Sequence, residues 1–309
     1  MVLLPIPWAN RVWALPFLTA LTPSEGFYKD KKRAHKPLTD WARQLLLVVK
    51  RWVGKRPLIA VADRSYAVIS LLHSLTGQVS LISRLRLDAA LYEPAPPSAA
   101  GKRGRKRLKG RRLPTLQQIA ADPTTPWQSM SIADWYGGKS QTVAYVSQTA
   151  VWYHTGKPPV AIRWVLVRWE GKLAGFVSND PTLEAGDMLT YFVRRWSIET
   201  TFALVRAPLG VETQRQWSDA AISRTTPVLL GLFTLVTLLA DGLSTAGLVV
   251  SQRSSWYCKA HPTFSDALAS VRRHLWRGMH FQTSAFEPEV VKLSAQQFQL
   301  WENALAWAA

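Results

Sequence analysis

One sixteen-residue segment combines a carboxylate with two guanidinium groups at helical spacing. It runs from Tyr191 to Arg206 as YFVRRWSIETTFALVR. At ~100° per residue, Arg195, Glu199 and Arg206 fall within about 40° of one another on one predicted helix face, with Tyr191 at its edge. The carboxylate could bind a cation and the guanidinium groups could bind phosphate. The same spacing is also typical of an exposed salt bridge on an amphipathic helix.

A second carboxylate follows an uninterrupted apolar run. Leu58 to Ala62 has the length of a strand, and its composition predicts a central strand buried on both faces. Asp63 would then lie at the carboxyl end of that strand, where catalytic side chains are often found.

The surrounding elements alternate between helix and strand patterns up to about Tyr92. Short strands are predicted from Trp127 to Ser178, and helices from about Glu184 onward. Val228 to Ala240 is apolar over 13 residues, too short for the ~20 that span a bilayer, and predicts a buried core helix. The pattern therefore predicts a mixed α/β protein and no membrane segment.

The chain of 309 residues has 38 Lys and Arg against 20 Asp and Glu, a formal net charge of +18. Such a charge favours a polyanionic partner, of which nucleic acid is the commonest. The single cysteine, Cys258, excludes a disulfide framework and a thiolate metal cluster. The N-terminus shows no export signal, which favours a cytoplasmic protein.

Several longer blocks resemble one family, the DDE-type transposases of bacterial insertion sequences. The helix with the family's catalytic glutamate carries a tyrosine-arginine-glutamate-lysine box, which SNDPTLEAGDMLTYFVRRWSIETTFALVR resembles. The other similar blocks are PWANRVWALPFLTALTPSE, ADRSY, RLRLDAALYEP, GRKRLKGRRLPTL, WYGG, TAVWYHTG, PPVAIRWVLVR and LGVETQRQWSDAAISRTTP, which together span most of residues 5 to 240.

The resemblance implies an RNase H-like core and a metal-dependent nuclease site. Asp63 matches the family's second acid and Glu199 its third, and Tyr191, Arg195 and Arg206 match the box as DNA contacts. Tyr191 and Arg195 are separated by three residues where the usual box has two, and Arg206 replaces lysine. Two Mg²⁺ ions about 4 Å apart, or Mn²⁺, would be held by the carboxylates during cleavage and strand transfer.

The family's first aspartate lies before the block that starts here with LLPIPWANRVWALP, and no counterpart occurs in this sequence. Glu25, Asp30 and Asp40 precede Asp63, but their contexts predict a loop and a helix start. We therefore expect these residues to be a C-terminal portion of a longer bacterial transposase, inactive or weakly active alone. A non-catalytic DNA-binding remnant is the alternative, and a basic RNA-binding protein is a third.

Two further segments predict DNA contacts. The first is a basic run with no acid, comprising Lys102, Arg103, Arg105, Lys106, Arg107, Lys109, Arg111 and Arg112. The second is QRQWS, in which Arg215 and Trp217 could meet bases. The alternatives are a solvated loop for the first and core packing of Trp217 for the second. Double-stranded DNA, as element ends and target, is the expected partner of a homodimer, without a nucleotide cofactor.

The predicted organisation has four parts. Residues 1–94 form the first part of the RNase H-like core, 95–183 a basic linker and β-rich insertion, 184–250 the core part with the Glu199 helix, and 251–309 a helical tail. Two other acids are expected to be structural: Asp88, paired with Arg84 or Arg86, and Asp180, at a turn or helix cap. The six histidines lack the spacing of a zinc site.

Overall fold

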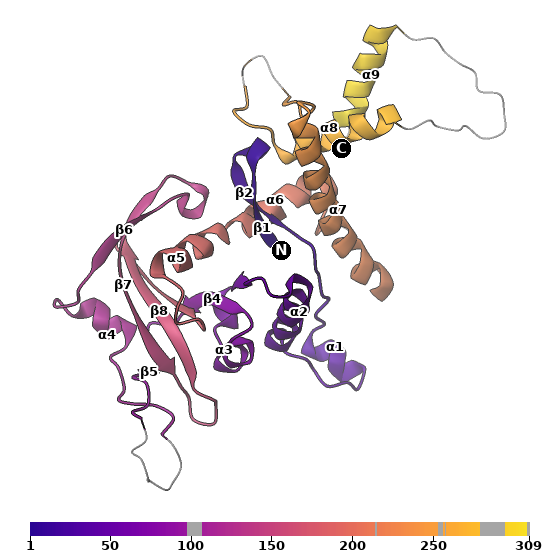
Figure 1. Cartoon of the computed structure of the whole chain (residues 1–309). Coiled ribbons are helices and arrows are strands. Elements are labelled where there is room, and N and C mark those ends of the chain that lie inside the picture. The colour runs from indigo at the N-terminus through magenta and orange to yellow at the C-terminus, as the bar shows by residue number, and fades with distance from the viewer. Residues whose placement is uncertain (98–106, 214, 253–255, 257, 279–293, 308–309) are drawn as a thin grey trace. The chain divides into compact units, whose positions relative to one another are not determined.

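The computed structural model describes residues 1–97, 107–213, 215–252, 256, 258–278 and 294–307. The chain divides into two compact units, each considered by itself (Figure 1). The sheet unit comprises Ala20–Trp196, and the helical unit comprises Met1–Thr19 with Ser197–Ala309. This division follows other boundaries than the four predicted parts, which stay a prediction.

The described part of the sheet unit contains one seven-stranded mixed sheet. Its strand order is β3-β4-β9-β8-β7-β5, and β6 also pairs with β7. Only β3 and β4 are parallel among these pairs. The strands are β3 (Ile59–Val61), β4 (Ser80–Leu85), β5 (Leu91–Tyr92), β6 (Gln128–Ile132), β7 (Gln141–Trp152), β8 (Val160–Trp169) and β9 (Lys172–Ser178). β6 to β9, which fall within the predicted β-rich insertion, belong to the same sheet as β3 and β4.

Helices cover both faces of this sheet (Figure 1). Alternate strand residues point to opposite faces, so Trp164 packs with α3 (Ile69–Leu75) while its neighbour Val165 packs with α5 (Ala185–Arg194). α2 (Leu38–Val53) and α4 (Leu116–Ala121) add side chains to the α3 side. The unit also contains α1 (Glu25–Asp30). The mixed α/β architecture predicted from the sequence is confirmed.

The strand before Asp63 differs from its prediction. β3 covers only Ile59–Val61, its residues are half-buried, and it lies at the end of the strand order. Because β9 occupies the other edge of β4, β3 pairs within the described residues with β4 alone. The expectation of a central strand buried on both faces was therefore wrong.

The helical unit is built around an N-terminal hairpin. β1 (Val2–Ile6) and β2 (Arg11–Leu15) pair antiparallel. The ring of Trp13 lies 5.6 Å from that of Phe233 and 6.3 Å from that of Phe264, and the two Phe rings are 4.6 Å apart. These rings join the hairpin to α7 (Asp219–Thr245) and α8 (Phe264–Gly278). The unit also contains α6 (Ser197–Leu209) and α9 (Ala295–Trp307).

Helix α7 is apolar on two opposite faces. One face packs into the core of the helical unit through side chains that include Leu230, Phe233 and Val236. The other face exposes large aliphatic side chains, among them Val228 at 65% and Leu235 at 59%. Within the described residues α7 is also the one helix long and apolar enough to cross a membrane by length and composition, which is weak evidence. The prediction of a fully buried core helix was wrong, because only one face is buried in this unit.

Candidate functional site

Asp63 is positioned by the parallel pair β3–β4. Its side chain is exposed, two residues beyond Val61 and immediately before the 3-10 helix Arg64–Tyr66. The backbone of Ala62 donates to the Ile82 carbonyl at 2.9 Å, so the chain stays in register with β4 up to the residue before Asp63. Asp63 therefore lies where the sequence predicts it, just past the carboxyl end of a strand.

A buried serine fixes the peptide of Asp63. Ser83 lies on β4, is 0% exposed, and donates its hydroxyl to the Asp63 carbonyl at 2.7 Å. The same carbonyl accepts the backbone N–H of Tyr66 at 3.0 Å. These two hydrogen bonds fix the backbone of Asp63, while its carboxylate stays exposed to solvent. The sequence analysis did not single out Ser83; the available signal was a small polar residue inside the apolar strand pattern LISRL.

The predicted continuous helix from Tyr191 to Arg206 is interrupted. α5 ends at Arg194, and α6 begins at Ser197. The backbone of Arg195 donates to the Phe192 carbonyl at 3.1 Å, and that of Trp196 to the Val193 carbonyl at 3.0 Å, which closes a turn. The prediction of a single helix face that carries Arg195, Glu199 and Arg206 was therefore wrong.

An aromatic cluster explains why the chain turns at Trp196. The Trp196 ring lies 6.1 Å from Tyr136 at an interplanar angle of 85°, and Gly137 is close enough that a β-carbon there would lie 3.5 Å from Trp196 Cδ1. Tyr136 and Gly137 belong to the WYGG block and adopt left-handed backbone conformations, with φ of 49° and 76°. Trp135 of the same block lies 5.2 Å from Trp169. This cluster holds the residue that precedes α6.

The residues of the predicted box are distributed over both units. Tyr191 and Arg195 belong to the sheet unit, whereas Glu199 and Arg206 belong to the helical unit. Glu199 lies exposed in the first turn of α6. Arg206, in the last turn, donates its Nε to Glu212 Oε2 at 2.6 Å. Arg206, which the resemblance marks as a DNA contact, is thus paired with a carboxylate of its own unit.

Among the described residues no complete set of metal ligands is assembled. A hard divalent cation takes six or more oxygen ligands, of which carboxylates supply several in a metal enzyme. No group of three or more His, Cys, Asp or Glu side chains that could hold a metal occurs in the described part of the chain. Asp63 and Glu199 are the two predicted ligands, Asp63 in the sheet unit and Glu199 in the helical unit. Each contributes one carboxylate to its own unit's surface.

The described end of the basic run, residues 107–112, packs against residues 92–94 and is called the stem. Lys102, Arg103, Arg105 and Lys106 lie outside the described residues. Lys109 places its Nζ 3.6 Å from the ring centre of Tyr92 and 4.7 Å from that of Tyr153. Arg111 Nη2 pairs with Glu93 Oε1 at 2.9 Å. Gly110 packs where a β-carbon would lie 2.6 Å from the Pro94 carbonyl oxygen, so this position needs glycine.

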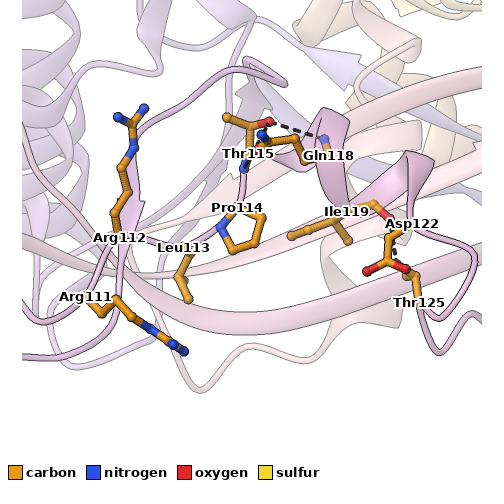
Figure 2. Close-up of a pocket in the computed structure, with 9 residues that line it drawn as sticks. All are labelled: Arg111, Arg112, Leu113, Pro114, Thr115, Gln118, Ile119, Asp122 and Thr125. Carbon is orange, nitrogen blue, oxygen red and sulfur yellow. Dashed lines mark hydrogen bonds between the residues drawn. The ribbon is translucent and has the colours of Figure 1, made fainter.

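Arg107 and Arg112 remain exposed at this stem. Arg112 and Arg111 line one end of a cavity of about 820 Å³, and Asp122 and Thr125 lie at its other end (Figure 2). Between them Thr115 caps α4 by accepting the Gln118 backbone N–H at 3.2 Å. The cavity thus combines exposed guanidinium groups with hydroxyl and amide groups.

Trp217 does not pack into a core. Its side chain is 95% exposed, immediately before Ser218, which caps α7 by accepting the Ala221 backbone N–H at 3.2 Å. Arg215 beside it is also exposed. The alternative of core packing for Trp217 was therefore wrong, and both side chains are accessible to a partner.

The two acids expected to be structural have protein partners. Arg86 donates to Asp88 through Nε at 2.8 Å, and its hydrogen bonds lower the pKa of that carboxyl. Asp180 accepts the Thr182 hydroxyl at 2.6 Å and the Ser80 hydroxyl at 2.8 Å, bonds that together lower its pKa despite the opposing effect of burial. The expected pairing of Asp88 and the expected turn at Asp180 are confirmed.

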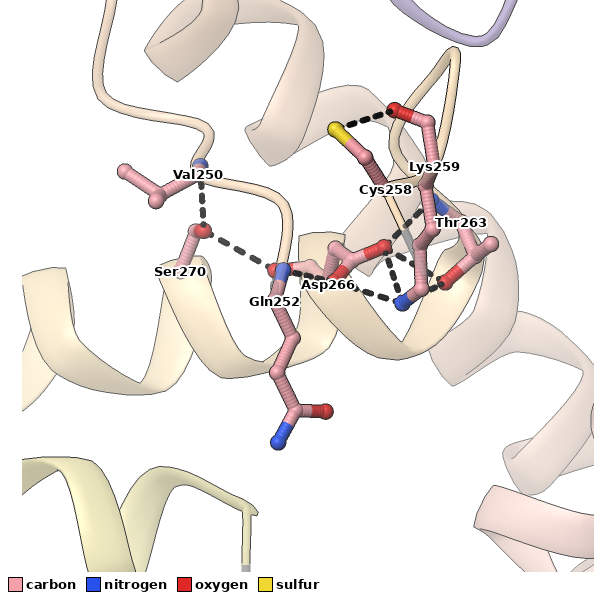
Figure 3. A network of polar contacts seen from close by, with 7 residues as sticks. All are labelled: Val250, Gln252, Cys258, Lys259, Thr263, Asp266 and Ser270. Atoms are coloured by element: carbon pink, nitrogen blue, oxygen red, sulfur yellow. Dashed lines mark hydrogen bonds and ion pairs between the residues drawn. The ribbon is translucent and has the colours of Figure 1, made fainter. Parts of the chain in front are cut away.

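A buried acid in the helical unit is saturated by protein donors (Figure 3). Asp266 is 0% exposed and accepts the backbone N–H groups of Gln252 at 2.8 Å and Thr263 at 2.7 Å. Lys259 Nζ lies 2.9 Å from its Oδ2. Burial acts to raise the pKa of Asp266, but these donors outweigh it and lower the pKa. With its oxygens engaged in this way, Asp266 ties the segment before α8 to that helix.

The tail arginines also have protein contacts. Arg272 donates Nη1 to the Ala306 carbonyl at 3.2 Å, and the Arg273 guanidinium lies 5.9 Å from the Trp307 ring centre. Arg277 pairs with Glu302, with Nε 2.7 Å from Oε1. These side chains join α8 to α9.

Comparison with known proteins identifies the family. A search of curated proteins finds no match. The family model described as DDE superfamily endonuclease matches residues 1–159, half of the chain, and this range includes Asp63 and the strands of its sheet from β3 to β7 but not β8 and β9. Endonucleases of this superfamily generally use divalent metal ions, and the mixed sheet between helical layers is consistent with their RNase H-like fold. The chain belongs to the DDE superfamily of endonucleases.

Proposed function

We propose that this DDE superfamily endonuclease is a DNA transposase that cuts and joins the strands of a bacterial insertion sequence. The observation that carries the proposal is the family match over residues 1–159, because within it Asp63 follows a strand of a mixed sheet with its backbone held and its carboxylate exposed. Asp63 and Glu199 are two of the acids that bind Mg²⁺, for which Mn²⁺ can substitute.

A third carboxylate is part of the proposal. The described residues offer no third acid near either predicted ligand that would complete a metal group. Asp88 and Asp180 are engaged by Arg86 and by hydroxyl groups. In this proposal the third acid is not one of the described residues, and the chain by itself is inactive or weakly active.

The partner of the proposed enzyme is double-stranded DNA, as element ends and target. A net charge of +18 favours a polyanion. Arg107 and Arg112 are exposed at the stem, where they can contact phosphates without selecting a sequence. Trp217, at 95% exposure beside Arg215, is placed to stack on or wedge between bases.

The proposal is tested by nicking of a DNA that carries the element ends. The assay compares this chain with a form extended upstream, each in Mg²⁺ and in chelator. We expect nicking only by the extended form in Mg²⁺, and a loss of at least ~10²-fold in its Asp63→Asn and Glu199→Gln variants, since removing one ligand or donor of a charged site typically costs that much. Asp88→Asn is the matched control and should keep full activity.

The possible results distinguish the candidate functions. Nicking that survives both Asp63→Asn and Glu199→Gln would refute the assignment of these acids. Retention of DNA binding with no nicking in any form would favour the second candidate function, a non-catalytic DNA-binding remnant. This candidate is supported by the lack of a metal-binding group among the described residues. A preference for RNA over element-end DNA in competition would overturn both.

A further inference from the structure

The residue beside Asp63 on the neighbouring strand is Arg84. β3 and β4 run parallel with Val61 opposite Ile82, so two residues further along each strand Asp63 comes opposite Arg84. Asp63 keeps an extended backbone, with φ of −74° and ψ of 167°, so the alternation of side chains continues to this residue. Val61 and Ile82 both pack on the α5 side of the sheet. Asp63 and Arg84 therefore lie on that same face.

Two aromatic rings hold the guanidinium group of Arg84 at this place. Its Cζ atom lies 5.9 Å from the ring centre of Phe176 and 5.8 Å from that of Phe192. Both rings are buried, and their centres are 4.7 Å apart. The Cζ atom of Arg195 lies 5.5 Å from the ring centre of Phe192, so a second guanidinium group contacts the same ring. Positive charge is therefore concentrated on the face that carries Asp63.

The N–H donors of the half-buried Arg84 guanidinium are not used by the described part of the chain. A guanidinium group has five such donors and no acceptor. Among the described residues no hydrogen bond or ion pair joins these donors to a protein oxygen. The next acid along the chain, Asp88, is already engaged by Arg86 through two hydrogen bonds. Aromatic rings attract the positive charge but supply no oxygen acceptor, so the donors of Arg84 are available to an anionic ligand.

We propose that Arg84 binds the phosphate at which the DNA strand is cut beside Asp63, an inference that rests on the proposed function. Neighbouring strands are about 4.8 Å apart, so a phosphate at the Asp63 carboxylate is within reach of an arginine side chain on the next strand. A guanidinium group binds phosphate through two parallel N–H···O bonds, which fix the orientation of the phosphate. Its positive charge also offsets the repulsion between the phosphate and the carboxylate of Asp63. Arg84 is thus a substrate-binding residue next to the candidate metal ligand.

DNA binding in the presence of a chelator tests this contact without strand cleavage. Two duplexes that carry the element end are compared, one unmodified and one with an uncharged methylphosphonate in place of the phosphate at the element boundary. Losing hydrogen bonds to a charged group weakens binding at least ~10-fold. We expect Arg84→Gln to lose that factor on the unmodified duplex and to bind the methylphosphonate duplex as the wild type does. Fluorescence anisotropy measures the Kd values.

Three further variants serve as controls. Arg86→Gln removes the same charge two residues further along the chain, but Arg86 is already paired with Asp88, so the ratio of the two Kd values should stay that of the wild type. Arg84→Lys keeps the charge without the paired N–H donors and should recover part of the lost binding. Asp63→Asn should abolish nicking by the extended form and keep the wild-type ratio. Circular dichroism checks that each variant is folded.

Two results would overturn the role of Arg84. Equal losses of Arg84→Gln on both duplexes would show that it acts through the fold or through total charge. Equal binding of the two duplexes by the wild type would overturn the contact without any variant. Failure of the proposed function gives a different result, because an extended form that keeps the wild-type ratio but does not nick refutes the function and leaves the phosphate contact of Arg84 standing.

Discussion

The two units bury their apolar residues in different ways. In the sheet unit, β8 sends Trp164 to one helical layer and Val165 to the other, and each is at most 1% exposed. In the helical unit, the longest helix buries Phe233 completely but leaves Leu235, two residues on, 59% exposed. A sheet between two layers of helices is buried on both faces, whereas α7 is buried on one face alone. The packing of the first unit can therefore hold Asp63 in place by itself, whereas the second leaves part of the apolar surface of α7 exposed.

The comparison is sharpened most strongly by Phe176→Ala. Phe176 is 1% exposed on β9, and its ring lies 4.7 Å from Phe192, which joins α5 to the sheet. We expect a loss of ~3–5 kcal/mol in the free energy of unfolding, since truncating a buried Phe removes its burial and leaves a cavity. Urea unfolding followed by circular dichroism measures it. Phe27→Ala, at a position 39% exposed on α1, is the control and should change little; equal losses would mean that the sheet is not the stable part.

The second test concerns the most buried acid of the helical unit. Asp266→Asn removes the charge that faces Lys259, and breaking a buried ion pair costs ~3 kcal/mol in unfolding free energy. Because the pKa of Asp266 is lowered in the folded state, its stabilisation is complete above the unfolded pKa of about 3.9 and is lost as the pH falls through the folded value.

We therefore expect the wild type and Asp266→Asn to differ at pH 7, to begin to converge near pH 4 and to converge fully only below the lowered folded pKa. Thermal unfolding at several pH values measures this difference. The exposed Asp122, whose pKa is lowered by Thr124, gives the control Asp122→Asn, for which we expect a much smaller effect. A difference that persists unchanged at low pH would contradict the role of the Asp266 charge.

The third test concerns the junction between the units' sequences. Gly137→Ala forces an L-residue into φ of 76° and brings a β-carbon to 3.5 Å from Trp196 Cδ1. A left-handed conformation costs an L-residue about 1–2 kcal/mol, so the sheet unit should lose that much stability. Gly186→Ala, in α5 where a β-carbon would lie 3.9 Å from Met130 Sδ, should instead stabilise by about 0.5–1 kcal/mol. The same sign for both variants would contradict the strained turn at Gly137.

Features that depend on the local sequence pattern could be predicted from the sequence alone. The start of α5 after Glu184, the place of Asp63 after a strand, the Arg86–Asp88 pair and the turn at Asp180 followed from periodicity and turn chemistry. Features that depend on distant neighbours did not follow. The break between Arg194 and Ser197 arises because Trp196 contacts Tyr136, about 60 residues away in sequence, and helical periodicity carries no information on that contact.

Burial was the other point where the sequence pattern was insufficient. Apolar runs predicted a doubly buried β3 and a fully buried α7, yet β3 lies at the end of the strand order and α7 exposes Val228 and Leu235. An apolar run shows that a surface avoids water but does not say whether the same unit, or another molecule, covers it.

The smallest expected effect separates two kinds of basic residue within one predicted DNA contact. Lys109 lies over Tyr92 at 3.6 Å, whereas Arg107 is exposed. Lys109→Ala should cost ~0.5–1 kcal/mol in unfolding free energy through the lost cation–π contact and leave the salt dependence of DNA binding unchanged. Arg107→Ala should leave stability unchanged and lower the slope of log K against log salt by ~0.9, the value for one phosphate. If Lys109→Ala lowers the slope as well, its ammonium contacts a phosphate while it lies on the ring, and the stem itself is part of the DNA-binding surface.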